Sequence, residues 1–124
     1  MEYLHTGLVA STTEQADRFY IGILGMKKTD SMVADRTLMQ QLFGINEDGE
    51  IVKYQDGNTL FEVFVRAGYR VPQGHIPHSC IKVQDLSSVV AQCKAAGLEV
   101  VEAIKGNRVI TFISDFDGNR FEMK

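Results

Sequence analysis

The chain has 124 residues, of which 44% are hydrophobic and 23% charged, enough for one compact domain or two small fused modules. Its formal net charge of −3, without any cluster of Lys or Arg, argues against a nucleic-acid partner or a polybasic membrane contact. The chain has neither an apolar run of membrane-spanning length nor the pattern of a signal peptide. The only cysteines, Cys80 and Cys93, fall in different predicted elements, so we expect no disulfide scaffold and a cytoplasmic protein.

The first half of the chain is predicted to contain a strand, a helix and three further strands. After a strand at 3–10, Ser11 and Glu14 form a capping-box pattern that predicts a helix start. Apolar residues then recur at helical spacing up to Gly25, which is expected to end the helix. The later predicted elements are a strand at 26–34, a short surface helix at 35–43, and strands at 51–55 and 59–65 joined by an Asp-Gly-Asn turn.

The second half repeats this order. A strand is predicted at 77–84, followed by a helix that Asp85 caps and Gly97 ends. Three further strands are expected at 98–104, 108–113 and 120–124. The Gly- and Pro-containing segment between the halves is predicted to be a linker.

Several residue spacings and short motifs are the same, or nearly so, in the two halves. The spacing from His5 to Gly25 is 20 residues, and that from His78 to Gly97 is 19. Asp-Gly-Asn also precedes a Phe-Glu pair twice, ending at Glu62 and Glu122. An internal duplication explains these matches. We therefore predict an α+β fold of two βαβββ modules forming one domain, with modules at 1–66 and 77–124, a linker at 67–76, and a helical insertion near 35–45 in the first module.

Polar side chains share one face of the predicted strands. Because side chains alternate along a strand, Glu62 and Glu122 point away from their apolar neighbours, and His78 points away from Ser79 and Ile81. Two imidazoles and two carboxylates meeting at one point indicate a divalent cation. The donor set of His5, Glu62, His78 and Glu122 suits Zn, Ni, Co, Fe(II) or Mn.

Each of these residues also has an ordinary interpretation. A single strand His is more often a hydrogen-bonded residue than a ligand, and a Glu on a polar face is usually solvated. The four residues occupy matching positions in the two halves, and this match favours a metal site. His75 lies three residues before His78 and is an alternative ligand, but His78 fits the repeat better.

Five segments carry a resemblance to the vicinal oxygen chelate superfamily, which includes glyoxalase I, methylmalonyl-CoA epimerase, extradiol dioxygenases and bleomycin- or fosfomycin-resistance proteins. They span nearly the whole chain. The segments are Leu4-His5-Thr6-Gly7-Leu8-Val9, Arg18-Phe19-Tyr20 with Leu24-Gly25-Met26, Phe61-Glu62, His78 to Val83 with Asp85, and Asp115-Phe116-Asp117-Gly118-Asn119-Arg120-Phe121-Glu122.

The resemblance implies an open, eight-stranded, barrel-like sheet around one divalent metal ion, with ligands from the first and fourth strands of each module. His5, Glu62, His78 and Glu122 fall at those positions. A His-Glu-His-Glu set resembles bacterial glyoxalase I, whereas the related dioxygenases use two His and one carboxylate. The implied activity is that of a lyase or isomerase of the lactoylglutathione lyase type, moving a proton through an enediolate that the metal stabilises. Glu122 is the first candidate for the base and Glu62 the second.

Three other activities remain open: an acyl-CoA epimerase, a non-catalytic binder of a drug or metabolite, and a ring-cleaving dioxygenase. Small-molecule contacts are expected from Phe64, Cys80, Arg120 and His75, while Leu60 shares the face of Glu62 as a further pocket candidate. The resemblance also implies a homodimer.

Overall fold

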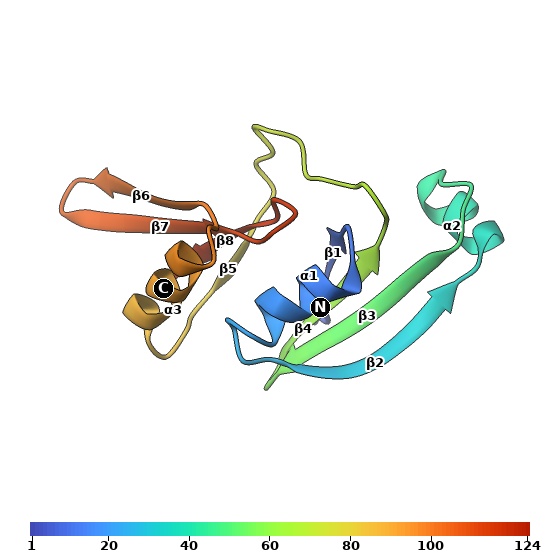
Figure 1. Cartoon of the computed structure of the whole chain (residues 1–124), viewed down its shortest axis with the longest axis horizontal. Coiled ribbons are helices and arrows are strands. Elements are labelled where there is room, and N and C mark those ends of the chain that lie inside the picture. Colours follow the sequence, from blue (N-terminus) through green and yellow to red (C-terminus); the bar gives the residue numbers. More distant parts are fainter. The chain divides into compact units, whose positions relative to one another are not determined.

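The computed structural model describes residues 1–124 and divides the chain into two compact units, Met1–Arg70 and Val71–Lys124. Each unit contains one open four-stranded sheet with its own helices (Figure 1). No helix of the chain is long and apolar enough to cross a bilayer.

The first unit contains four strands and two helices. In chain order these are β1 (Thr6–Ala10), α1 (Thr13–Tyr20), β2 (Lys27–Ala34), α2 (Arg36–Phe43), β3 (Gly49–Asp56) and β4 (Thr59–Val65). The strand order across the sheet is β1-β4-β3-β2, in which only β1 and β4 run parallel. A parallel neighbour needs a long connection, and the segment from α1 through β3 provides it.

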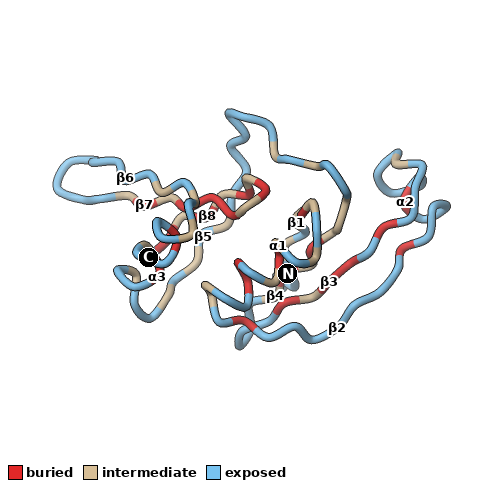
Figure 2. Tube along the Cα trace, in the orientation of Figure 1, coloured by how far each residue is buried: buried red, intermediate tan, exposed pale blue.

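Aromatic side chains join α1 to the sheet. Phe19 and Tyr20 of α1 are fully buried, and Tyr20 stacks on Tyr54 of β3 with ring centroids 4.9 Å apart. The Tyr20 ring also lies 5.8 Å from that of Phe61 on β4. Burial of each large side chain stabilises the fold by about 1.5–3 kcal/mol, so this cluster fixes which face of the sheet α1 covers. Figure 2 shows the buried residues concentrated on α1, β3 and β4 in this unit.

The boundaries of α1 differ slightly from the prediction. The N-cap is Thr12, whose hydroxyl accepts a hydrogen bond from the Gln15 amide at 3.1 Å, rather than Ser11. Either residue can cap a helix, so the pattern alone does not separate neighbouring positions. The helix ends at Tyr20, and a turn leads to Gly25, which adopts a left-handed conformation with φ of 70°.

The predicted surface helix between β2 and β3 is present as α2. Asp35 caps it by accepting a hydrogen bond from the Leu38 amide at 2.8 Å. Met39 is 1% exposed and packs with Ala34 and Ile51 of the flanking strands. A Cβ atom at Gly49 would lie 3.0 Å from the Met39 side chain, so a glycine there lets α2 sit close to β3.

The second unit repeats the first without the inserted helix. Its elements are β5 (Ser79–Ile81), α3 (Leu86–Ala95), β6 (Val100–Lys105), β7 (Arg108–Ser114) and β8 (Arg120–Met123). The strand order β5-β8-β7-β6 matches that of the first sheet, and β5 is parallel to β8. The predicted α+β fold of two βαβββ modules is therefore confirmed.

The core of the second unit lies between α3 and the sheet. Val89 and Cys93 of α3 are buried, as are Ile113 on β7 and Phe121 and Met123 on β8. Burial raises the pKa of the Cys93 thiol to about 11. This core faces one side of β8 only, which leaves the alternate residues of β8 on the opposite face.

Two hydrogen-bonding features set the ends of β8 and β5. The carboxylate of Asp115 accepts hydrogen bonds from the amides of Asp117 and Asn119, at 3.0 and 2.9 Å, and so fixes the turn that leads into β8. Strand β5 has three residues instead of the expected eight, because β8 offers only a short partner and Pro77 has no amide hydrogen to donate.

Candidate metal and substrate site

In the first unit, Glu62 lies on the face of β4 that α1 does not cover. Its neighbours Phe61 and Val63 are buried against α1, as the alternation of the strand predicts. Gly7 of β1 pairs with Glu62, and His5 precedes Gly7 by two residues. This register places the His5 Nε2 atom 3.3 Å from Glu62 Oε2.

The second unit contains the equivalent pair. Cys80 of β5 is in register with Glu122 of β8, and His78 precedes Cys80 by two residues. The His78 Nε2 atom lies 3.9 Å from Glu122 Oε2. The His78 Nδ1 donates a hydrogen bond to the carbonyl oxygen of Ile76 at 2.8 Å. A ring nitrogen that donates to a carbonyl leaves the other nitrogen available as a metal ligand.

A lysine accompanies each glutamate. The Lys53 ammonium lies 3.3 Å from Glu62 Oε1, and the Lys124 ammonium lies 3.4 Å from Glu122 Oε1. In both units, therefore, one carboxylate oxygen faces an imidazole and the other faces a cation. Each lysine balances the charge of the carboxylate oxygen that does not face the imidazole.

These pairs remain accessible from the open face of each sheet. The His5 and Glu62 side chains are 42% and 18% exposed, and those of His78 and Glu122 are 33% and 23% exposed. In neither unit does a third His, Cys, Asp or Glu join the pair to form a larger donor group. Imidazole nitrogen and carboxylate oxygen fit a divalent transition ion, and each unit supplies two such donors. That the two pairs share one ion stays a prediction.

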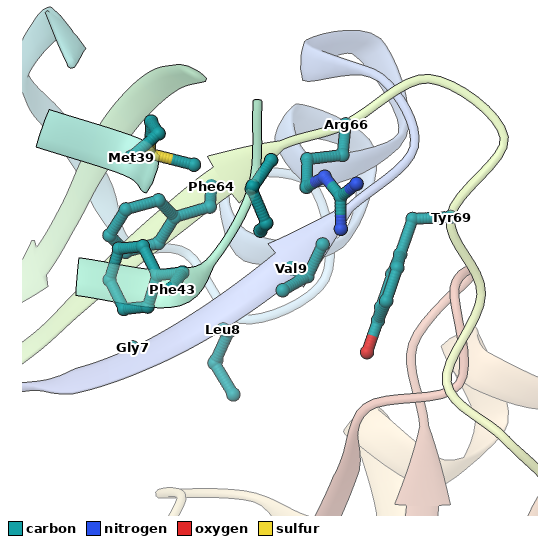
Figure 3. Close-up of a pocket in the computed structure, with 9 residues that line it drawn as sticks. Gly7, Leu8, Val9, Met39, Phe43, Phe64, Arg66 and Tyr69 are labelled. Atoms are coloured by element: carbon teal, nitrogen blue, oxygen red, sulfur yellow. The ribbon is translucent and has the colours of Figure 1, made fainter. Parts of the chain in front are cut away.

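A cavity of about 290 Å³ opens on the same face of the first sheet (Figure 3). Its walls come from β1, from α2 and the loop after it, and from β4 and the loop after it. The lining residues are Gly7, Leu8, Val9, Met39, Phe43, Ile45, Phe64, Arg66 and Tyr69. Most of this lining is apolar, and the guanidinium of Arg66 is its only formal charge.

The other predicted substrate contacts have different surroundings. Phe64 lines the cavity, whereas Leu60, on the same strand, is not among its walls. Cys80 is exposed on the Glu122 face. The Arg120 guanidinium lies 3.9 Å from the Glu99 carboxylate. His75 is exposed, and its backbone amide donates a hydrogen bond to the Pro72 carbonyl oxygen. A role for Cys80, Arg120 or His75 in substrate binding stays a prediction.

Among the lining residues, only Phe64 was assigned to a site from the sequence. Val9 and Arg66 continue the alternation that places Gly7 and Phe64 on this face, so that signal was present. Tyr69 belongs to a loop, where no periodicity applies, so no sequence pattern indicates its position in the cavity. Figure 3 shows Arg66 and Tyr69 at the opposite end of the cavity from Met39 and Phe43.

Solved structures with the same architecture include several glyoxalase family proteins. A glyoxalase family protein from Enterococcus faecalis matches with a TM-score of 0.73 and 19% identity over 98% of this chain and 95% of that one. The trypanothione-dependent glyoxalase I of Leishmania major matches with a TM-score of 0.74 and 20% identity, over 99% and 85% of the two chains.

A fosfomycin resistance protein, FosX from Mesorhizobium loti, gives a TM-score of 0.69 at 13% identity, over 98% and 89% of the two chains. These TM-scores establish a shared fold. No curated protein matches the chain. The family model described as Glyoxalase/Bleomycin resistance protein/Dioxygenase superfamily matches residues 3–123. With both βαβββ modules present in the fold, the chain belongs to the glyoxalase/bleomycin resistance protein/dioxygenase superfamily.

Proposed function

We propose that the protein is a metal-dependent isomerase or lyase of the glyoxalase I type, which moves a proton between adjacent carbons of a small oxo-compound or its thiol adduct. His5, Glu62, His78 and Glu122 hold one divalent ion in this proposal. The observation that carries it is the repeated pairing of one imidazole with one carboxylate, at 3.3 Å in the first unit and 3.9 Å in the second.

The second carboxylate favours this chemistry over oxygen chemistry. Both repeats carry a glutamate at the same position of the fourth strand. A site with two carboxylates has one available to act as a base while the remaining donors stay in place. When bound, the ion supplies Lewis-acid polarisation of the substrate oxygens.

Glu122 is proposed as the base. A carboxylate oxygen accepts the proton as the C–H bond breaks, and the same oxygen returns the proton as a C–H bond forms on the neighbouring carbon. The ammonium of the largely exposed Lys124 side chain lies 3.4 Å from Glu122 Oε1, the carboxylate oxygen that does not face His78. Glu62 has the corresponding position beside Lys53 and is the second candidate.

The test is turnover of the hemithioacetal formed from methylglyoxal and glutathione, using protein loaded with Zn or Ni. We expect thioester formation by the wild type, and a loss of about 10²- to 10⁴-fold in kcat for Glu122→Gln. Glu102→Gln, which neutralises an exposed carboxylate on β6 of the same unit, is the matched control and should leave kcat unchanged.

Metal analysis completes the experiment. Protein purified without chelator should retain a divalent ion, and EDTA should remove the activity. A metal-loaded protein that does not turn over this hemithioacetal, or a Glu122→Gln variant as active as the wild type, would contradict the proposed reaction. We also expect a homodimer, which light scattering after gel filtration will detect.

A further inference from the structure

We propose that the cavity of the first unit binds an aromatic or branched hydrocarbon group of the substrate, and that the inserted helix α2 determines this specificity. The proposal rests on the proposed function for the position of the reacting atoms, which it places beside His5 and Glu62. The cavity itself is defined by side chains of the first unit alone.

The cavity continues from the His5–Glu62 pair along the same strands. Gly7 is in register with Glu62, and Val9 is in register with Phe64. Phe64 follows Glu62 by two residues, which corresponds to about 7 Å along a strand. A substrate with its oxygens near Glu62 would therefore place a substituent of roughly one ring length in the cavity.

The volume and the lining of the cavity determine which substituents it can bind. An apolar cavity of about 150 Å³ holds a benzene molecule, so a volume of about 290 Å³ accommodates a phenyl or branched alkyl group. The Phe43 and Phe64 rings meet edge to face with centroids 5.4 Å apart, and an aromatic ligand beside them can pack against this pair. Met39 adds a polarisable thioether to the same wall.

The polar residue of the cavity limits the charge of the ligand. Arg66 Nε lies 3.0 Å from Glu47 Oε1, and its guanidinium is 5.9 Å from the centre of the Tyr69 ring. Glu47 offsets the charge of Arg66, and no acidic side chain lines the cavity to pair with a cation, so the lining disfavours a positively charged substrate. The structure therefore assigns the cavity to a neutral or anionic oxo-compound with an aryl or branched alkyl substituent.

The helix that builds the cavity is the main asymmetry between the two repeats. α2 and the loop after it supply Met39, Phe43 and Ile45, and the second unit has no helix at the equivalent position. Met39 anchors α2 to the sheet, which leaves Phe43 in position to close one side of the cavity. The insertion thus converts one face of a repeated module into a pocket.

Gly7 allows the cavity to be filled without disturbing the fold. A Cβ atom at Gly7 would lie 3.8 Å from Phe64 Cε2, an ordinary van der Waals distance, and its φ angle is not in the left-handed region. Valine is also favoured in strands. Gly7→Val should therefore fold while its methyl groups occupy the cavity. Ala103→Val, on exposed strand β6, is the matched control.

The binding test uses toluene and metal-free protein labelled with ¹³C at the methionine methyl groups. We expect toluene to shift the Met39 methyl resonance, assigned with Met39→Leu, and we expect Gly7→Val to weaken this binding at least fivefold. Ala103→Val should bind as the wild type does. Absence of a toluene-induced shift in the wild type, or equal affinity in Gly7→Val, would overturn the assignment.

Two further measurements separate this proposal from its alternatives. A Met39 resonance that responds to protein concentration but not to toluene would mean that another protein surface covers the cavity, and would also overturn the proposal. With active protein, Gly7→Val should lower kcat/KM for the phenylglyoxal hemithioacetal more than for that of methylglyoxal, and an unchanged ratio contradicts the specificity claim. Toluene binding in a protein that turns over neither compound supports the cavity and contradicts the proposed reaction.

Discussion

At the level of single residues, backbone and side-chain contacts prepare His78 to act as a ligand. Its Nδ1 donates to the Ile76 carbonyl, and its ring meets the Phe112 ring edge to face with centroids 4.9 Å apart. These contacts fix both the tautomer and the ring plane, which is how proteins commonly orient metal-binding histidines. His75, three residues earlier, has no such restraint among its side-chain contacts and lies exposed.

Tyr54 gives a prediction about stability that is independent of the proposed site. Its hydroxyl donates to Asp17 Oδ1 at 2.7 Å, while the Lys28 ammonium lies 2.7 Å from Asp17 Oδ2. Tyr54→Phe leaves one oxygen of the partly buried Asp17 carboxylate without this donor. We expect the free energy of unfolding to fall by about 1–2 kcal/mol, measured by urea denaturation at pH 7.

The same variant should alter the alkaline pH dependence of stability. Burial, and next the Asp17 carboxylate, raise the pKa of Tyr54 well above its usual value near 10. Above pH 10 the unfolded chain loses the phenolic proton of Tyr54, whereas the folded chain keeps it. The free energy of unfolding therefore falls as pH rises. Between pH 10 and 11 the wild type should lose stability more steeply than Tyr54→Phe. An exposed control, Tyr3→Phe, should retain the wild-type slope, and equal slopes for all three proteins would show this account to be wrong.

At the level of elements, the predicted caps had different outcomes: Asp85 caps α3 as expected, whereas Thr12 and not Ser11 caps α1. Asp35 and Asp85 cap α2 and α3 by accepting hydrogen bonds from the amides of Leu38 and Ser88, at 2.8 and 2.9 Å. Both starts follow from the preference of Asp for the N-cap. The position of Ser11 was less informative, because Thr12 beside it can make the same hydrogen bond and does so.

The two caps provide a matched pair of substitutions for the inserted helix. Asp35→Ala and Asp85→Ala should each lower the free energy of unfolding by about 1 kcal/mol. Only Asp35→Ala should also weaken toluene binding, because only α2 supplies walls of the cavity. Circular dichroism with denaturant and the Met39 methyl resonance measure the two effects. Equal toluene affinities in the two variants would show that α2 does not shape the cavity.

At the level of the whole molecule, duplication accounts for the two half-sites. The sheets have the same strand order and each sets a His against a Glu, whereas the lysines beside the two glutamates come from non-equivalent positions. One unit alone offers two strong donors, whereas a stable transition-metal site usually has three or four protein ligands. The function we propose therefore depends on both repeats, whether a site is completed within one chain or between two.

Metal titration tests this dependence. One Zn ion should bind per chain, and His5→Ala and His78→Ala should each reduce the affinity at least about tenfold, or about 1.4 kcal/mol, although they lie in different units. His75→Ala is the control and should bind as the wild type does. Isothermal titration of protein stripped with EDTA and then dialysed gives stoichiometry and affinity together. Two weak ions per chain, or a His75→Ala variant as impaired as His78→Ala, would rule out the shared site.

The sequence by itself determined the repeat, the strand faces and the correspondence of His5 with His78 and of Glu62 with Glu122. These depend on local rules, namely the alternation of side chains along a strand and the spacing of equivalent residues. Only the tertiary structure revealed the cavity, because Gly7, Phe43 and Tyr69 come from segments far apart in the chain. Their meeting depends on the parallel pairing of β1 with β4 and on the packing of Met39 against β3, neither of which a local pattern specifies.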